Sequence, residues 1–446
     1  MKKNNWDLEK LKDATTQLFY RGNVAVFLEE EKAKDIQDKD QLVSVLNTAM
    51  KQAADEELKV LQKPRKPWIS QDTLLLVEDK QAAKARRLKC PEAMKEYTDI
   101  YKKVKKSARK DKRIWIQEQC AKVEQNHTDN KEREAYKLVK QITGGFKGAN
   151  ARVIKDAHGT LLSKEDDILK RWTEYTQQLY SDSGAHNTSV ISRLEARHDR
   201  ECSENDNEIL VAEVERAIRR LKDRKSPGVD GIPSELIKAG GPELVSEIHR
   251  LCNIIWEEEE WPEDWTKSVL VTIPKKGDLT DCANYRTIAL ISHLSKILLL
   301  IILDRLNATL DDSLSEEQGG FRRDRGTVQQ ILTLRLIAEK YLERGNCFVD
   351  YTKAFDSVWH DGFWAVLHSF IVPRKLITLL QNLYAKSMLA VKVRIRLSEW
   401  FKAELGSRQG DPISPLAFIH LTAWESYGTS RVQSRNQRSQ RTWTND

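Results

Sequence analysis

A single aspartate follows a short apolar run, and its position is typical of a residue that binds a metal ion. Asp350 comes directly after Cys347–Val349, which has the pattern of a buried strand preceded by Gly345-Asn346. From Thr352 the pattern becomes helical. Most aspartates at the end of a strand instead form turns or cap helices. The choice between these interpretations therefore depends on the residues elsewhere in the chain.

Composition limits the possible partners and compartments. The 446 residues carry 74 Lys and Arg against 67 Asp and Glu, a net charge of +7, which permits a nucleic-acid partner without requiring one. The six cysteines include no C-x-x-C pair, which argues against a disulfide framework or a zinc site. The longest apolar run, Ile297–Leu303, is far shorter than the roughly 20 residues of a membrane span. With no signal-peptide pattern, we expect a soluble intracellular protein, in the nucleus, the cytoplasm or both.

The N-terminal third is rich in lysine, and its periodicity predicts helices. Ser70 is a candidate N-cap for one of them. In the next predicted helix only Asp111 opposes a run of basic residues, flanked by Tyr101 and Trp115: Lys102, Lys103, Lys105, Lys106, Arg109, Lys110, Lys112 and Arg113. This run is either a surface that contacts phosphates or one solvated face of a long helix, and the sequence favours neither interpretation.

After residue 208 the chain alternates helices, strands and glycine-rich loops. We predict an amphipathic helix over Glu208–Lys222, a strand over Ser268–Ile273 and a helix from Asn284 to Leu306. Two further strands are predicted at Leu389–Arg396 and Trp400–Leu405. Residues 151–162 resemble a small hairpin, and a helix follows them to about Tyr180.

Six segments in this part carry a resemblance to a known family: KSPGVDGIPSELIKAGG, WPEDWTKSVLVTIPKKGD, NYRTIALISHLSKI, EEQGGFRRDRGT, FVDYTKAFDSV and SRQGDPISPLAF. In this order, over residues 208–419, they closely resemble the reverse transcriptase domain of LINE-type non-LTR retrotransposons. Reverse transcriptases of bacterial introns and of the telomere type share the core motifs. The loops at Lys225–Gly231 and Phe321–Thr327 favour the LINE type.

The resemblance implies an α+β fold in which an N-terminal helical region precedes right-hand polymerase fingers and an incomplete palm. The expected parts are a basic pre-polymerase region (1–180), a linker (181–207), fingers (208–345), a partial palm (346–420) and a disordered or frameshifted tail (421–446). The implied activity is RNA-directed DNA synthesis, in which a primer 3′-hydroxyl attacks the α-phosphate of a deoxynucleotide. The implied partners are an RNA template, a DNA primer or target and deoxynucleotide triphosphates, with no membrane. No protein partner is implied.

Two Mg²⁺ ions perform the chemistry in the family, and their preference for oxygen ligands suits carboxylates. By the resemblance, Asp350 is the first metal-binding carboxylate, and the backbone carbonyl of Tyr351 helps to hold a metal. Asp356 is expected to be structural, because its side chain would point away from Asp350.

The resemblance also implies residues that bind the nucleotide. Phe355 matches the bulky residue under the sugar that excludes a ribose 2′-hydroxyl. Arg286, with Lys275 or Lys276, matches finger positions at the triphosphate, where negative charge requires fixed cations. Exposed loop lysines are the competing interpretation for both lysines. Gln409 and Gly410 match the loop that supports the templating base and nucleotide, and glycine permits a close backbone approach.

Three basic residues are candidate contacts to template or primer phosphates, namely Lys225, Arg322 and Arg325, with solvated surface as the competing interpretation. The family's second catalytic motif, an aromatic-x-Asp-Asp hairpin, is not found after the Gln-Gly loop. The Asp-Asp pairs of the chain, Asp166-Asp167 and Asp311-Asp312, both precede Asp350.

The missing motif leads us to expect a truncated reverse transcriptase with little or no polymerase activity of its own. The first alternative is a catalytically inactive nucleic-acid-binding remnant. The second is a decayed reading frame without a function.

Overall fold

The structure is a computed structural model of the chain. It describes residues 6–59, 66–86, 91–143, 153–182, 184, 207–310, 314, 316, 318–322, 325–340, 353–370, 372–394 and 396–420. The chain forms two compact units. One contains residues 1–59 and 151–446, and the other contains residues 60–150.

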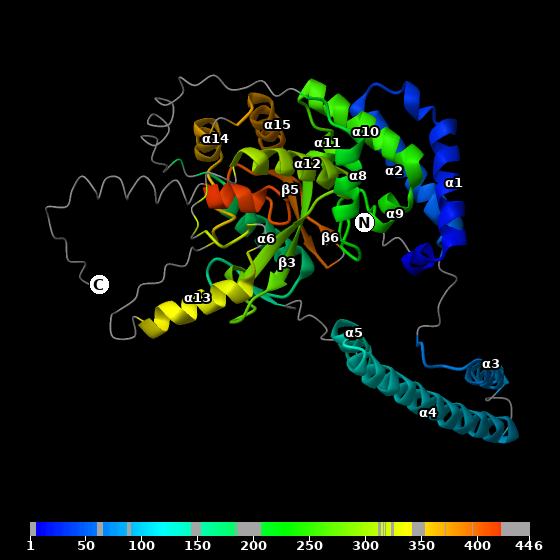
Figure 1. Cartoon of the computed structure of the whole chain (residues 1–446). Coiled ribbons are helices and arrows are strands. Elements are labelled where there is room, and N and C mark those ends of the chain that lie inside the picture. Colours follow the sequence, from blue (N-terminus) through cyan, green and yellow to red (C-terminus); the bar gives the residue numbers. More distant parts are fainter. Residues whose placement is uncertain are drawn as a thin grey trace. The chain divides into compact units, whose positions relative to one another are not determined.

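A five-stranded sheet lies at the centre of the first unit (Figure 1). Its central strand β3 (Lys267–Pro274) pairs antiparallel with β4 (Tyr285–Leu290) and parallel with β5 (Met388–Val393). The short strands β6 (Arg396–Leu397) and β7 (Phe401–Lys402) both pair antiparallel with β5. β3 is rich in β-branched and apolar residues, which favour a buried strand, and its position confirms the strand predicted there.

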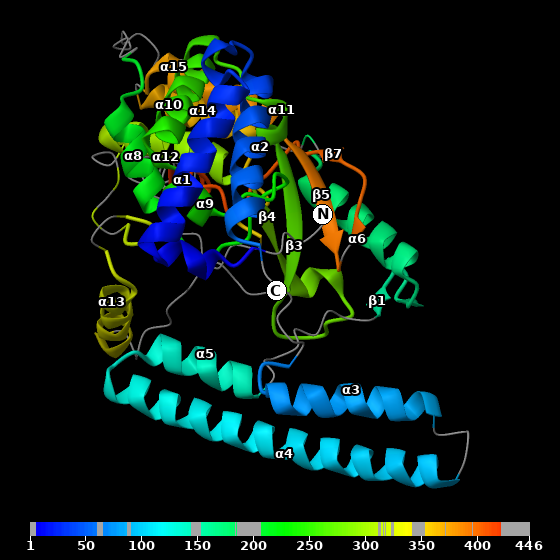
Figure 2. The same ribbon diagram turned by 90° about the vertical axis from the view of Figure 1, so that its right-hand side faces the viewer.

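Helix α6 (Glu165–Tyr180) packs on one face of this sheet, and a group of helices covers the other side (Figure 2). Side chains from α6, β3, β4 and β5 share one hydrophobic cluster. Trp172 and Tyr285 meet edge to face within it, with ring centroids 5.0 Å apart. The hairpin of β1 (Ile154–Lys155) and β2 (Leu161–Leu162), which was predicted, extends this layer.

The larger cluster is helical. It contains residues of α8 (Val211–Arg220), α9 (Ser234–Ala239), α10 (Gly241–Glu258), α11 (Glu263–Thr266), α12 (His293–Leu310), α14 (His360–Ser369) and α15 (Arg374–Ala385). Helix α12 is apolar around most of its circumference, as expected of a helix buried on several sides. By contrast, no residue of α13 (Thr327–Lys340) is buried.

The first two helices belong to the sheet-containing unit, although they were expected in a separate N-terminal region. Helices α1 (Ala14–Glu30) and α2 (Lys39–Glu57) share the larger cluster with α9 and α10. The guanidinium of Arg250 on α10 donates hydrogen bonds to the carbonyls of Ala33 and Ile36 in the turn between them. Since α6 also packs on the sheet, the compact units divide the chain differently from the expected boundary at 181–207.

Two local predictions were wrong. Tyr285–Leu290 is the strand β4, whereas a helix was expected from Asn284. Its side chains alternate between a buried and a more exposed face, as in a strand, and the helical pattern begins only at His293. The predicted strand Leu389–Arg396 is a hairpin of β5 and β6, because the chain reverses at Arg394, which has a φ of 55°.

A helix was also expected from Thr352, but the described residues after it form turns. Lys353 has a φ of 53°, which interrupts any helix, and α14 starts only at His360. The expected helix over Glu208–Lys222 is the shorter α8, and the expected strand over Trp400–Leu405 is reduced to β7. Most of the expected linker 181–207 and the tail 421–446 lie outside the described residues.

The second unit consists of α3 (Gln71–Arg86), α4 (Pro91–Thr128) and α5 (Glu132–Ile142). The Ser70 hydroxyl accepts a hydrogen bond from the Thr73 amide at 3.3 Å, so the predicted N-cap of α3 is confirmed. The predicted α+β class is also confirmed. Within the described residues, no helix is both long and apolar enough to cross a membrane.

The loop between α8 and α9 packs tightly on the chain that follows β4. A Cβ atom at Gly228 would lie 2.5 Å from the backbone of Ile291 and Ser292. The Ser292 hydroxyl donates to the Asp230 carboxylate at 2.6 Å, and burial raises the pKa of that carboxyl group. This loop is therefore held by backbone packing and by a buried hydrogen bond.

We predict that Gly228→Ala lowers the free energy of unfolding by roughly 1–3 kcal/mol, because the added methyl group meets backbone atoms that cannot rotate away. Gly22→Ala is the matched control. Gly22 lies within α1 with no atom near its hypothetical Cβ, so this change should stabilise the chain by about 0.5–1 kcal/mol. Urea unfolding of both variants measures the difference. Equal effects at the two positions would contradict the packing described for Gly228.

Candidate active site

Three segments that are far apart in the sequence meet beside the sheet, and we call this place the three-segment junction. They are Tyr180 at the end of α6, the turn at residues 353–358 and the loop at residues 404–410. The amides of Glu404 and Leu405 donate to the Tyr180 carbonyl at 2.9 and 3.1 Å. The loop also pairs with the turn, because the Gly406 amide donates to the Val358 carbonyl at 2.8 Å.

A buried polar network holds the junction together. The Tyr180 hydroxyl donates to the Asp356 carboxylate at 2.9 Å and lies 3.1 Å from the Thr287 hydroxyl on β4. Tyr180 is only 2% exposed. Burial raises the pKa of Asp356, while the Tyr180 hydrogen bond and the ammonium groups of Lys353 and Lys275 lower it. These contacts support the expected structural role of Asp356.

Gly406 lies at the centre of the junction and has a φ of +80°. A Cβ atom there would lie 2.6 Å from the Asp356 carbonyl oxygen and 2.9 Å from the Tyr180 ring. Its own carbonyl accepts a hydrogen bond from Nε2 of His360 at 2.8 Å, and burial lowers the pKa of that histidine. Both the backbone conformation and the close packing therefore favour glycine.

Phe355 is positioned by the junction and faces two other aromatic rings. Its carbonyl accepts a hydrogen bond from the Ser407 amide at 2.7 Å, which fixes the backbone after the ring. The ring centroid lies 5.3 Å from that of Phe418 and 6.0 Å from that of Phe321. The latter residue belongs to the loop between α12 and α13, so the structure brings one predicted site residue next to a second predicted loop.

Gln409 and Gly410 lie on the backbone of β4. The Ala289 amide donates to the Gln409 carbonyl at 2.7 Å. Gly410 has a φ of +126°, and a Cβ atom there would lie 2.6 Å from the Ala289 carbonyl oxygen. The close approach that glycine permits is therefore to β4 itself. The buried Arg408–Asp411 ion pair, at 3.2 Å, closes the base of the same loop.

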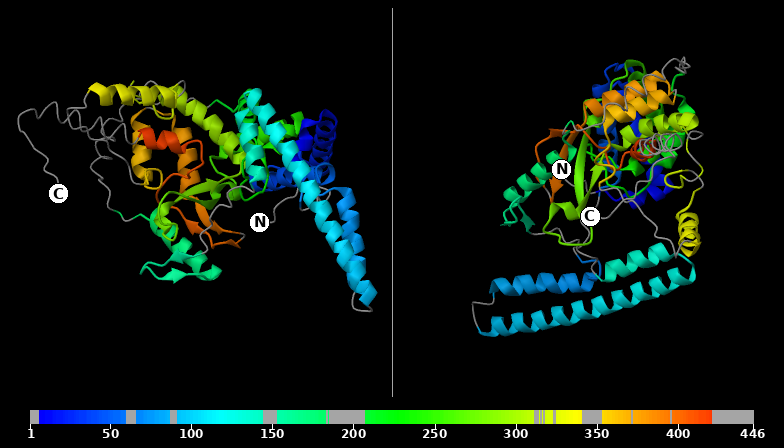
Figure 3. Two further views of the ribbon diagram at one scale, coloured as in Figure 1. Left: turned by 90° about the horizontal axis from the view of Figure 1, so that it is seen from below. Right: turned by 90° about the vertical axis from the view of Figure 1, so that its left-hand side faces the viewer.

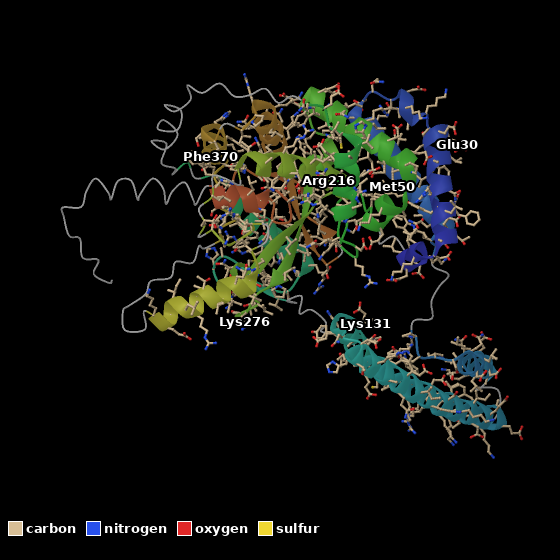
Figure 4. All side chains as sticks on the ribbon, viewed as in Figure 1. Glu30, Met50, Lys131, Arg216, Lys276 and Phe370 are labelled. Carbon is tan, nitrogen blue, oxygen red and sulfur yellow. The ribbon has the colours of Figure 1, made fainter. Side chains whose placement is uncertain are left out.

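Arg286 and Lys275 lie on the exposed parts of the β3–β4 hairpin. Arg286 is directly opposite Ile273 in the register of the two strands, and it alternates with Tyr285 and Thr287, which face α6. Lys275 is at the turn between the strands, next to Lys276, which Figure 4 labels. Its charge acts on Asp356, so it lies near the three-segment junction.

The three predicted phosphate contacts have different surroundings. Lys225 is exposed in the loop before α9, where its charge acts on the half-buried Lys296. Arg325 forms an ion pair with Glu316. Arg322 lines a cavity of about 360 Å³ with Phe321, Leu303 and residues of the segment 412–420. Of the three, Lys225 belongs to the loop between α8 and α9, and Arg322 and Arg325 belong to the loop between α12 and α13.

The two predicted metal ligands, Asp350 and Tyr351, lie outside the described residues. Within the described ranges, no group of three or more His, Cys, Asp or Glu side chains is arranged to hold a metal ion. Two carboxylates of the described turn and loop are already engaged, Asp356 with Tyr180 and Asp411 with Arg408. Neither is therefore offered as a metal ligand.

Comparison with known proteins identifies the part of the chain that forms this site. Residues 273–424 match the family described as reverse transcriptase (RNA-dependent DNA polymerase). These residues form a reverse transcriptase domain. The match includes β4, Phe355 and the loop with Gln409 and Gly410, and it confirms the predicted family.

The relatives come from mobile elements. The chain is 30% identical over 222 residues to a probable RNA-directed DNA polymerase from transposon BS of Drosophila melanogaster, which is 48% of the chain and 24% of that protein. It is 26% identical over 263 residues to the transposon TX1 149 kDa protein of Xenopus laevis. This match covers 57% of the chain and 20% of that protein. The chain is 27% identical over 222 residues to the RNA-directed DNA polymerase from mobile element jockey of Drosophila funebris. This match covers 48% of the chain and 24% of that protein. The chain thus spans a quarter or less of these relatives.

Sequence reasoning missed Tyr180 and Gly406 as residues of the site. The signal for Gly406 was weak, since the glycine stands one position before the recognised SRQG run. Tyr180 gave no signal, because it is 176 residues from Asp356 and only the fold brings the two together.

We predict that Tyr180→Phe lowers the free energy of unfolding by about 1–3 kcal/mol at neutral pH, since the buried Asp356 carboxylate loses its donor. The lost hydrogen bond favours the ionised carboxylate, so its removal raises the folded-state pKa of Asp356 further. The deficit should therefore be small at pH 4 and should increase as the pH rises toward 7.

Tyr175→Phe is the control for this pH dependence, because the Tyr175 hydroxyl accepts a hydrogen bond from Lys353 and contacts no carboxylate in the described network. Urea unfolding at pH 4, 5.5 and 7 makes the comparison. A Tyr180→Phe deficit that is the same at all three pH values would contradict the described role of the hydroxyl.

Proposed function

We propose that the reverse transcriptase domain of this chain serves RNA-templated DNA synthesis in a non-LTR retrotransposon. The observation that carries the proposal is the joint position of Phe355 and the Gln409–Gly410 loop, both fixed on β4 or beside it. In the proposed assignment, residues 208–345 are the fingers and 346–420 belong to the palm. The proposed substrates are deoxynucleotide triphosphates, an RNA template and a DNA primer, inside the cell.

In this proposal Phe355 lies under the sugar of the incoming nucleotide. Its backbone is hydrogen-bonded to Ser407, and its ring contacts Phe418, so the ring has little freedom to move away from a 2′-hydroxyl. Such a fixed ring selects deoxyribose by exclusion. The Gln409–Gly410 backbone, held by Ala289, would support the nucleotide and the templating base.

Arg286 and Lys275 would contact the triphosphate. Both are exposed on one hairpin, and neither forms an ion pair with the other described side chains. Cations at these positions would stabilise the negative charge that develops as the leaving group departs. The hydrogen-bonded ladder between β3 and β4 fixes the backbone of the hairpin that carries both residues.

Asp350 and the carbonyl of Tyr351 would supply oxygen ligands to Mg²⁺, the cation proposed for this family of sites. When bound, such ions neutralise charge on the attacking and leaving oxygens of the phosphoryl transfer. After Gly410 the sequence contains no Asp-Asp pair. We therefore infer that this chain alone binds primer and template but extends a primer poorly, which keeps a binding-only role as the second candidate function.

Primer extension on an RNA template with Mg²⁺ tests the proposal, using the full chain and its Asp350→Ala variant. We expect little or no extension by either protein, and nanomolar to micromolar retention of the primer–template that weakens steeply as salt rises. Extension that disappears in the variant would support the polymerase assignment and refute the inferred inactivity. A chain that neither extends nor retains the primer–template would contradict the proposed function.

A further inference from the structure

Helix α4 has two different sides. It is 38 residues long, about 57 Å at 1.5 Å per residue. Figures 2 and 3 show α3 and α5 lying along the same side of α4 within this unit. That side carries apolar and small polar residues, including Val104, Ser107, Ala108 and Asp111, which are all partly buried. The opposite side has no helix of this unit packed against it.

The free side carries a dense row of cations, which we call the basic face of α4. All of its members are exposed: Lys102, Lys103, Lys105, Lys106, Arg109, Lys110, Lys112 and Arg113. At about 100° per residue, these eight positions occupy about half of the helix circumference. Among the described residues, Lys102 also pairs with Asp99 one turn earlier, at 3.6 Å.

The single acid in this stretch is turned away from the basic face. Asp111 accepts hydrogen bonds from the Ser70 hydroxyl at 2.7 Å and from the Thr73 hydroxyl at 2.6 Å, both at the start of α3. These bonds lower the pKa of Asp111. The carboxylate therefore stabilises the helix hairpin and does not neutralise the cations.

The aromatic residues near this stretch do not belong to the basic face. The Tyr101 ring stacks on Tyr97, with centroids 6.3 Å apart, and Trp115 is partly buried on the side toward α3 and α5. Binding of unstacked single strands uses exposed aromatic platforms. The eight residues of the basic face are all Lys or Arg, which are suited to phosphates, and Tyr101, which is 46% exposed, is the exposed aromatic residue among the two that flank them.

The charge density of the basic face is suited to a double helix. The basic face spans roughly 17 Å along the helix axis, and a DNA duplex presents about one phosphate per 1.7 Å of its own axis. About ten phosphates therefore lie along this length of a duplex, distributed around its axis, and one strand of the same length offers about half as many. We propose that the basic face of α4 binds the phosphate backbone of duplex DNA without reading its sequence. This surface is separate from the reverse transcriptase domain and does not rest on the function proposed for it.

The test is the affinity of the full chain for a 20-base-pair DNA duplex and for one of its strands, measured by fluorescence anisotropy at several salt concentrations. The test variant changes one stripe of the basic face, Lys106, Arg109, Lys110 and Arg113, to Gln. The control variant removes four exposed charges elsewhere, at Lys10, Lys34, Arg374 and Lys402. Gln retains the helical propensity of α4, and circular dichroism checks that both variants fold.

We expect the stripe variant to bind the duplex at least about tenfold more weakly and to lose up to about one unit of salt slope per cation. The affinity of the stripe variant for the single strand should decrease by a smaller factor. Three results would overturn the proposal: an unchanged duplex affinity, which would point to an acidic protein surface as the partner; an equal loss in the control variant; or a larger loss for the single strand. A further variant exchanges Lys for Arg and Arg for Lys at the same four positions. It should still bind the duplex, which would show that the effect of the Gln variant comes from lost charge and not from misfolding.

Discussion

The structure of the candidate site depends on one buried hydrogen bond, between the Tyr180 hydroxyl and the Asp356 carboxylate. A carboxylate taken out of water has to find donors, and this one finds them on a helix that is 176 residues earlier in the chain. The same tyrosine lies beside Thr287 and holds the loop at Glu404 through its carbonyl. Helix α6, the sheet, the turn at residues 353–358 and the loop at residues 404–410 are thus fixed relative to one another at a single residue.

This constraint explains why the glycines of the loop are where they are. Gly406 and Gly410 both have positive φ angles, and each lies against a backbone carbonyl, of Asp356 and of Ala289. The loop can therefore lie directly on the turn and on β4, with no side chain between them. Phe355 then has a fixed backbone on one side and an aromatic contact, Phe418, on the other. Rigid placement of this kind is what a site that selects among similar nucleotides requires.

The sequence allowed much of this to be predicted, because the motif loops are short, contain glycine and stand in a fixed order. It predicted Phe355, Gln409 and Gly410 as site residues, and the structure places all three in one region, while their roles stay predictions. It failed at β4, where six residues of strand run almost directly into the apolar helix α12, so one long helix was predicted. Local periodicity is ambiguous for so short a segment, and only pairing with β3 decides it.

Contacts between distant segments could not be predicted from the sequence. No pattern places Tyr180 beside Asp356, or α1 and α2 against α10, because these contacts arise from tertiary packing. The role of Asp111 had the same origin. In the sequence it was the one acid opposing a basic run, and only the packing of α3 shows that its carboxylate is used within the hairpin.

The central claim is that β4, Phe355 and the Gln409–Gly410 loop form one substrate surface. Hydrogen–deuterium exchange of the full chain, with and without an RNA–DNA primer–template, Mg²⁺ and the complementary deoxynucleotide, tests it most directly. The account predicts slower exchange in peptides covering residues 285–290 and 404–418 when the substrates are present, and unchanged exchange in α1 and α2. Protection that leaves both of these segments unchanged and appears only elsewhere in the chain would contradict the account.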